Sequence, residues 1–293
     1  MPESSHVPLV GFGTFNEFRD NDKVAAAVKH AIKVGYRHFD CAKLYGNELE
    51  IGKAINECID EGLVKREELF IVTKLWNDDH RPDRVRESCA GSLKRLGLDY
   101  LDCFMIHWPS PWVPGAALAD AEHGGTHNYK PDSTVTMRDT WTALEGLVEE
   151  GKIKSIGVSN FCIRLLKDLL SYCKIRPIAN EVELHPYHSN YNLVRFCQEH
   201  DIHVTAYSPL GKIGYRQPGD PSLIEDPVLQ EIGAKHNKSA AQVALRWNVQ
   251  RGVGVIPKSL TPSRIEQNFD IDFELSDEEM KRIDGLNKNH RFV

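Results

Sequence analysis

The sequence has none of the segments that direct a chain across or into a membrane. Its first residues, MPESSHVPLVGFG, contain no basic region followed by a long apolar run, so we expect no signal peptide. No apolar stretch approaches the ~20 residues of a membrane-spanning helix. The net charge of -6 leaves no basic excess for binding nucleic acid or an anionic membrane. We therefore expect a cytoplasmic protein that acts on small molecules.

The sequence also lacks the cysteine and histidine spacings of a disulfide framework or a metal site. The seven cysteines are odd in number and include no CxxC pair, which indicates free thiols in a reducing compartment. The 13 histidines raise the alternative of a metal-dependent barrel hydrolase, but no HxH occurs on an early strand. His185 and His188 are a poor ligand pair without carboxylate partners. The sequence therefore predicts no metal site.

Apolar runs and helix-like segments alternate along the whole chain. The predicted strands are 9–14, 38–42, 69–75, 101–108, 155–160, 178–184, 203–210 and 252–259. Between them lie segments with apolar residues at helical spacing. Asp22 is the expected N-cap of the first helix, Pro82 begins another, and Ser276 with Glu279 forms a capping box before the last.

Eight such strand–helix units predict a closed (β/α)₈ TIM barrel, with residues 1–293 forming one domain and long loops at its C-terminal face. An open doubly wound sheet is the alternative. It is disfavoured because GFGTF is not GxGxxG and no glycine fingerprint opens a helix elsewhere.

Polar residues follow or end the predicted strands, where the active sites of barrels lie. Asp40, Lys74 and His107 come from three consecutive strands, and Tyr45 lies on the loop after Asp40. A phenol has an ordinary pKa near ~10, and a neighbouring ammonium stabilises its anion. The aspartate would hold the lysine charged, the tyrosine would donate a proton to a carbonyl oxygen, and a neutral histidine would orient that carbonyl. Taken singly, each residue also has an ordinary structural explanation.

Several motifs together resemble those of the aldo-keto reductase family, over almost the whole chain. They are HFDCAKLYGNE, FIVTKLW, LDCFMIHWP, GKIKSIGVSNF, HPYH, YSPLG and IPKSLTPSRIEQN. The resemblance implies a monomeric barrel that binds NADPH and passes hydride directly to an aldehyde or ketone. It assigns the catalytic tetrad to Asp40, Tyr45, Lys74 and His107, and histidine in the last position favours carbonyl reduction over reduction of steroid double bonds.

The same resemblance implies the cofactor contacts. The carboxamide of the nicotinamide is assigned to Ser159 and Asn160, its face to Tyr207, and the adenosine 2'-phosphate to a lysine and an arginine near a helix N-terminus. The full set of expected cofactor residues is Thr14, Ser159, Asn160, Glu181, Tyr207, Ser208, Leu210, Gly211, Lys258, Ser259, Arg264 and Asn268.

Glu181 departs from the family pattern, which has glutamine at this position. An ionised glutamate can accept a hydrogen bond from the carboxamide but cannot donate one. We expect it to favour the cationic oxidised nicotinamide over the reduced form, and so to ease the oxidative direction.

The expected substrate pocket is aromatic. Trp76 and Trp108 match the family's aromatic walls, Phe15 stands where tryptophan is frequent, and Trp112 is a further candidate from the long loop after residue 108. The sequence ends at Val293, where many relatives continue into a tail over the substrate, so we expect an open pocket on that side. Gly124, Gly125 and Thr126 are similar to residues of sugar-reducing members, which adds aldoses and sugar phosphates to the candidate substrates.

A second functional class is also consistent with the family. Some relatives keep the fold and the cofactor but serve as channel-auxiliary or structural proteins. The complete tetrad favours the enzyme.

Overall fold

The computed structural model describes residues 7–16, 20–115, 130–212 and 219–293. Eight parallel strands pair in chain order, and a bridge between Val10 and Val255 joins the last strand to the first. They are β1 (Gly11–Gly13), β2 (His38–Asp40), β3 (Phe70–Leu75), β4 (Cys103–Ile106), β5 (Ile156–Ser159), β6 (Ala179–Glu183), β7 (His203–Tyr207) and β8 (Val253–Val255). The predicted (β/α)₈ barrel is confirmed, and the open sheet is wrong.

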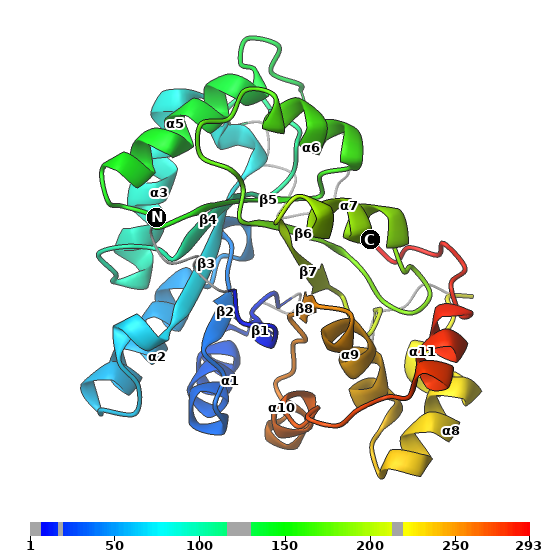
Figure 1. Cartoon of the computed structure of the whole chain (residues 1–293). Coiled ribbons are helices and arrows are strands. Elements are labelled where there is room, and N and C mark those ends of the chain that lie inside the picture. The colour runs from blue at the N-terminus through cyan, green and yellow to red at the C-terminus, as the bar shows by residue number, and fades with distance from the viewer. Residues whose placement is uncertain (1–6, 17–19, 116–129, 213–218) are drawn as a thin grey trace.

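Helices surround the strands on the outside of the barrel (Figure 1). They are α1 (Asn21–Val34), α2 (Glu48–Asp60), α3 (Pro82–Leu96), α5 (Met137–Glu149), α6 (Ile163–Leu170), α7 (Tyr191–Glu199), α8 (Pro227–His236), α9 (Ala240–Gln250), α10 (Pro262–Phe269) and α11 (Asp277–Asp284). The capping box of Ser276 and Glu279 is confirmed. The cap of α1 is Asp20, whose carboxylate accepts from the Lys23 amide, and not Asp22 as we expected.

The strands are shorter than the apolar runs predicted. β8 ends at Val255, so Lys258 and Ser259 lie on the loop beyond it. Glu181 is not at a strand end but in the middle of β6, opposite Ser159 of β5 and Thr205 of β7. It therefore lies within the barrel wall and not on a loop at its mouth.

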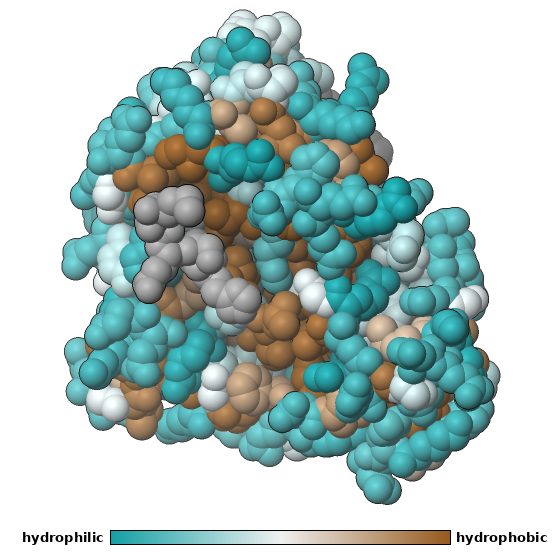
Figure 2. Space-filling view, in the orientation of Figure 1, coloured by the Kyte–Doolittle hydropathy of each residue, from teal (hydrophilic) through white to brown (hydrophobic). Residues whose placement is uncertain are grey.

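Buried apolar side chains fill the space between strands and helices. Five of the seven cysteines are buried, and all seven are free thiols. In the face seen in Figure 2, hydrophobic side chains gather at the centre and hydrophilic ones form the surrounding surface. Among the described residues, no helix is long and apolar enough to cross a membrane. Gly124, Gly125 and Thr126, on which the expectation of sugar substrates rests, lie outside the described residues.

Gly52 lets α2 pack directly on the end of α3. A Cβ at this position would collide with the backbone of Leu96, and Asn56, one turn along α2, donates to the Leu96 carbonyl at 3.0 Å. Alanine normally favours a helix over glycine by ~1 kcal/mol. Here the close approach excludes a side chain.

We expect Gly52→Ala to lower the melting temperature, because overpacking of this kind costs ~1–3 kcal/mol and outweighs the gain in helix propensity. Thermal unfolding followed by circular dichroism measures the effect. Lys53→Ala, at the exposed neighbouring position, is the matched control and should leave the melting temperature almost unchanged. A Gly52→Ala protein as stable as wild type would show that the two helices can separate freely.

Candidate active site

A single pocket of about 870 Å³ contains nearly all of the polar residues singled out from the sequence. The twelve expected cofactor residues line it, as do Asp40, Tyr45 and His107 of the expected tetrad. Lys74 does not reach the pocket surface, since its side chain is completely buried behind Asp40. Residues from seven of the eight strands and the loops after them therefore converge on one cavity.

The ammonium of Lys74 is the buried charge at the base of this pocket. It forms an ion pair with Asp40, donates to the Cys41 carbonyl at 3.1 Å, and lies 3.3 Å from Oε1 of Glu181. Burial by itself would lower the pKa of Lys74, but the two carboxyl groups outweigh it and hold that pKa well above the usual range. Lys74 is therefore charged at neutral pH.

Glu181 is the second carboxyl group on this one ammonium. Burial and, secondarily, the charge of Asp40 raise its pKa to about 8, against the opposing effect of Lys74. At neutral pH the carboxyl group is therefore mainly protonated. The ionised form that we expected from the sequence is the minor one, and a protonated Glu181 can donate a hydrogen bond as a glutamine would.

Tyr45 lies above Lys74, with its ring centre 5.4 Å from the ammonium and part of its side chain exposed to the pocket. Burial raises the pKa of the phenol, while Lys74 lowers it by charge and by a hydrogen bond. The burial effect is the larger, so the lowered pKa expected from the sequence is not what the structure shows. The phenol keeps its proton at neutral pH, and Lys74 stands ready to stabilise the anion once the proton leaves.

His107 faces Tyr45 across the pocket, with ring centres 5.8 Å apart. Burial and, secondarily, the charge of Lys74 hold its pKa well below the ordinary value, so the imidazole is neutral. Its Nδ1 atom is buried and has no hydrogen-bond partner in the part of the chain that the structure describes. The neutral histidine predicted from the sequence is confirmed in its charge state.

Four aromatic residues were expected to form the substrate pocket, and the structure divides them into two layers. Phe15 and Trp108 line the cavity, and the ring of Phe15 lies 5.1 Å from that of Tyr45. Trp76 packs behind against His107 at 5.1 Å, and Trp112 packs against Trp76 at 5.5 Å. Phe15 and Trp108 therefore form the wall of the cavity, and Trp76 and Trp112 support it.

Asn160 connects three strand ends beside the acid. Its Nδ2 donates to the His107 carbonyl at 2.9 Å and to the Ser159 hydroxyl at 3.1 Å, and its Oδ1 accepts from the Tyr207 hydroxyl at 2.9 Å. Its backbone amide donates to the carbonyl of Glu181 at 2.9 Å. A pocket wall of hydroxyl and amide groups next to a proton donor suits a planar amide such as a carboxamide.

The other end of the pocket is cationic and is built around α10. Lys258 and Arg264 are exposed there, and Arg264 has no acidic partner among the residues described. The amide of Thr261, the N-cap of α10, donates to the Ser259 hydroxyl at 3.1 Å. A lysine, an arginine and a helix N-terminus together fit a phosphate group.

The structure adds pocket residues that the sequence did not suggest. They are Gly13, Leu44, Pro209, Lys212, Ile224, Ser239, Ala240, Ala241, Ile256, Pro257, Leu260, Thr261, Gln267 and Val293. Three of them form the start of α9, which no strand-end rule would identify. Lys212 and Gln267 directly follow or precede residues of the expected set, so their positions could have been inferred.

The C-terminal residues are bound to a second buried glutamate of β6. Glu183 accepts from the backbone amides of Phe292 at 2.6 Å and Val293 at 3.2 Å. It also lies 3.1 Å from Nε2 of His185, so the expectation that this histidine has no carboxylate partner is wrong. Val293 lines the main pocket on the side that we expected to be open.

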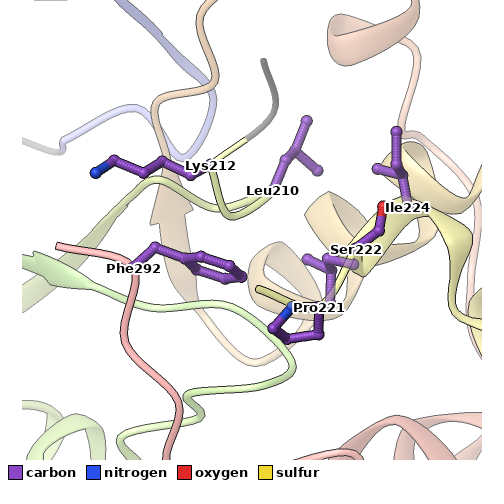
Figure 3. Close-up of a pocket in the computed structure, with 7 residues that line it drawn as sticks. Leu210, Lys212, Pro221, Ser222, Ile224 and Phe292 are labelled. Atoms are coloured by element: carbon purple, nitrogen blue, oxygen red, sulfur yellow. The ribbon is translucent and has the colours of Figure 1, made fainter. Parts of the chain in front are cut away.

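Phe292 also shapes a small apolar notch of about 20 Å³ next to the main pocket. Its ring points between Lys212 and Leu210 on one side and Pro221 and Ser222 on the other (Figure 3). A Cβ on Gly211 would meet this ring at 2.7 Å, so the glycine permits the close packing of Phe292 under the loop.

Residues 9–288 match the sequence model of the Aldo/keto reductase family. The chain belongs to this family. As an aldo/keto reductase it is 47% identical over 291 residues to Aldo-keto reductase family 1 member A1 of Sus scrofa, an alignment that covers 98% of this chain and 88% of the relative. Aldose reductase B of Dictyostelium discoideum is 46% identical over 295 residues, covering 98% and 91%. The family predicted from the motifs is confirmed, and with it carbonyl reduction as the reaction class.

The raised pKa of Glu181 has a consequence for the stability of this reductase. In the unfolded chain the carboxyl group has an ordinary pKa near 4.5, whereas in the folded protein it stays protonated up to about pH 8. The unfolded state therefore binds fewer protons in this interval, and the contribution of Glu181 to stability falls as pH rises through it.

Glu181→Gln removes this dependence, so we expect its melting temperature relative to wild type to rise between about pH 5 and pH 8.

Glu183→Gln provides the matched control on the same strand. Burial raises the pKa of Glu183, but hydrogen bonds from His185 and the Phe292 amide outweigh it and lower the pKa overall. Its carboxylate therefore stabilises the folded protein above its unfolded pKa, and its loss should destabilise at neutral pH. Thermal unfolding across pH measures both variants. Parallel pH profiles for Glu181→Gln and wild type would refute the raised pKa.

Proposed function

We propose that this aldo/keto reductase uses NADPH to reduce aldehydes, with aldose sugars or sugar phosphates among the candidate substrates, and that Asp40, Tyr45, Lys74 and His107 are its catalytic residues. The observation that carries the proposal is the protonated Tyr45 at the pocket surface, directly above a buried and charged Lys74. Reduction of a carbonyl needs a hydride at carbon and a proton at oxygen. The residues present are suited to the second task.

Tyr45 donates the proton as the carbonyl oxygen gains negative charge. The phenolate that remains lies next to the Lys74 ammonium, which stabilises it, and Asp40 keeps that ammonium in place. The neutral imidazole of His107 holds the carbonyl by hydrogen bonding without competing as a proton donor. Phe15 and Trp108 exclude water from the reacting atoms and give the pocket an apolar wall.

NADPH supplies the hydride when it is bound. The pocket fits it, because one end offers hydroxyl and amide groups beside Tyr45 and the other offers Lys258, Arg264 and the N-terminus of α10. A 2'-phosphate distinguishes NADPH from NADH, and the cationic end is suited to it. Ser159, Asn160 and Glu181 would bind the carboxamide, and Tyr207 would cover the ring.

The names of the matching relatives suggest the substrate class. The reductase of Dictyostelium discoideum is named for aldoses, and the apolar wall of the present pocket is also suited to the aldehydes of aromatic compounds. We further propose a monomer that acts in the cytoplasm.

Tyr45→Phe tests the acid. We expect turnover of a reactive aromatic aldehyde to fall by ~10²–10⁴-fold, because the phenol acts in the transition state. NADPH affinity should stay close to that of wild type, since the hydroxyl does not contact the phosphate end. Cofactor oxidation measures turnover, and quenching of tryptophan fluorescence measures binding. An equal loss of both would contradict the assignment of Tyr45.

The same assay separates the enzyme from a cofactor-binding protein without activity. A wild-type protein that binds NADPH but oxidises none of a panel of aldehydes would favour the second class.

Lys258→Met tests the cofactor preference. We expect NADPH affinity to fall by ~10-fold or more while NADH affinity changes little. The variant loses the lysine ammonium that would bind the 2'-phosphate, and only NADPH has that phosphate. Lys235→Met, at an exposed site on α8, is the control for a general change of surface charge. An unchanged ratio of NADPH to NADH affinity would remove Lys258 from the 2'-phosphate site.

A further inference from the structure

Glu181 stands between the pocket and the buried charges beneath it. Its carboxyl group lines the cavity with only 3% of the residue exposed, and Oε1 lies 3.3 Å from the ammonium of Lys74. Asp40 forms an ion pair with the same ammonium. Two carboxyl groups therefore share one cation in a place that water barely reaches.

The groups that face Glu181 come from every wall around it. They are Asp40 on β2, Lys74 on β3, Tyr45 after β2, Cys103 on β4 and Tyr207 on β7, and His107 lies behind them against the Tyr45 ring. His107 is neutral, and both phenols and the thiol keep their protons. Lys74 is thus the cation of this group, and the cluster is neutral only while one of the two carboxyl groups holds a proton.

The redox end of the cofactor must lie close to this cluster, an inference that rests on the proposed function. Hydride and proton reach the two ends of one carbonyl bond, so the hydride donor has to lie within a few ångströms of Tyr45. Glu181 lines the same part of the pocket, because it reaches the ammonium over which the Tyr45 ring lies. A change in the charge of the nicotinamide ring therefore changes the electrostatic potential at this carboxyl group.

The nicotinamide ring is neutral when reduced and positively charged when oxidised. We propose that Glu181 is a proton-linked partner of this charge: it holds a proton while NADPH occupies the pocket and releases the proton to solvent when NADP+ takes its place. The released proton leaves a carboxylate that balances the new positive charge. Glutamine, the usual residue of the family at this position, can bind a carboxamide but cannot make this exchange.

The raised pKa of Glu181 suits this residue to such a role. Burial and the charge of Asp40 raise its pKa to about 8, so at neutral pH it holds a proton that a nearby cation can displace. By reciprocity, if NADP+ promotes loss of the proton, then loss of the proton strengthens the binding of NADP+. The bias toward the oxidised cofactor that we expected from the sequence becomes one that grows with pH.

The test compares NADPH and NADP+ binding to the intact protein by isothermal titration calorimetry across about pH 6 to 9.5. Both nucleotides carry the same 2'-phosphate, which titrates near pH ~6. The ratio of their dissociation constants therefore cancels that titration and retains only effects of the ring. In wild type we expect NADP+ to gain affinity relative to NADPH by ~10-fold over this range, the size of an ordinary coupling between two sites.

Repeating the titration near neutral pH in two buffers of different ionisation enthalpy counts the protons exchanged. A ~10-fold coupling lowers the pKa of Glu181 by about one unit, so NADP+ should release roughly half a proton per wild-type molecule and NADPH almost none. Glu181→Gln should bind both nucleotides, show a ratio independent of pH, and release no proton with NADP+.

A flat ratio in wild type, or a slope that Glu181→Gln retains, would overturn the inference and leave the proposed function intact. If wild type bound neither nucleotide, both the proposed function and this inference would be refuted. The proton count on wild type decides the matter without any variant, should Glu181→Gln fold poorly.

Discussion

The buried ammonium of Lys74 is the interaction on which the site depends. A charge in the interior must be paired, because its desolvation costs several kcal/mol. The pairing partners come from β2 and β6, on different sides of the barrel, so the requirement to satisfy one cation ties these strands to β3. The proposed role of Tyr45 as an acid depends on this ammonium, which lies beneath its ring and stabilises the phenolate.

The closed barrel extends this arrangement to the cationic end of the pocket. The strand ends supply the polar groups near Tyr45, while Lys258 and Arg264 lie on the chain after β8 and at the start of α10. Because β8 pairs with both β7 and β1, these cations come to lie at the same mouth as Asp40. A single cavity thus has a protonated phenol at one end and a cluster of cations at the other, which is the arrangement that the proposed use of NADPH would require.

The sequence predicted the barrel and most of the pocket because both depend on local patterns. Apolar runs that end in polar residues identify strand ends, and the barrel brings all strand ends together, so residues as distant as Thr14 and Lys258 could be assigned to one cavity. Arg264 and Asn268 were assigned only by the family resemblance. The start of α9 was missed because its position depends on how that helix packs, which no local pattern records. The cap of α1 was misplaced by two residues because Asp20 and Asp22 are equally good caps in sequence terms.

The protonation states of Glu181 and Tyr45 could not be read from the sequence. Whether Glu181 is ionised depends on its depth within β6 and on sharing one ammonium with Asp40, which are properties of the assembled interior. The same holds for Tyr45, where charge alone predicts a lowered pKa but burial has the greater effect. Residue types and their approximate neighbours were predictable, whereas the balance between opposing electrostatic effects was not.

The hydrogen bonds of Asn160 fix one wall of the pocket from within the protein itself. Asn160 adopts a left-handed backbone with φ of 65°, a conformation that asparagine tolerates better than most residues, and its side chain is fixed by His107, Ser159 and Tyr207. Ordering these groups is therefore a cost of folding, not of binding. A ligand therefore meets polar groups that hydrogen bonds already hold in place. Its binding free energy does not have to include the entropic cost of ordering them.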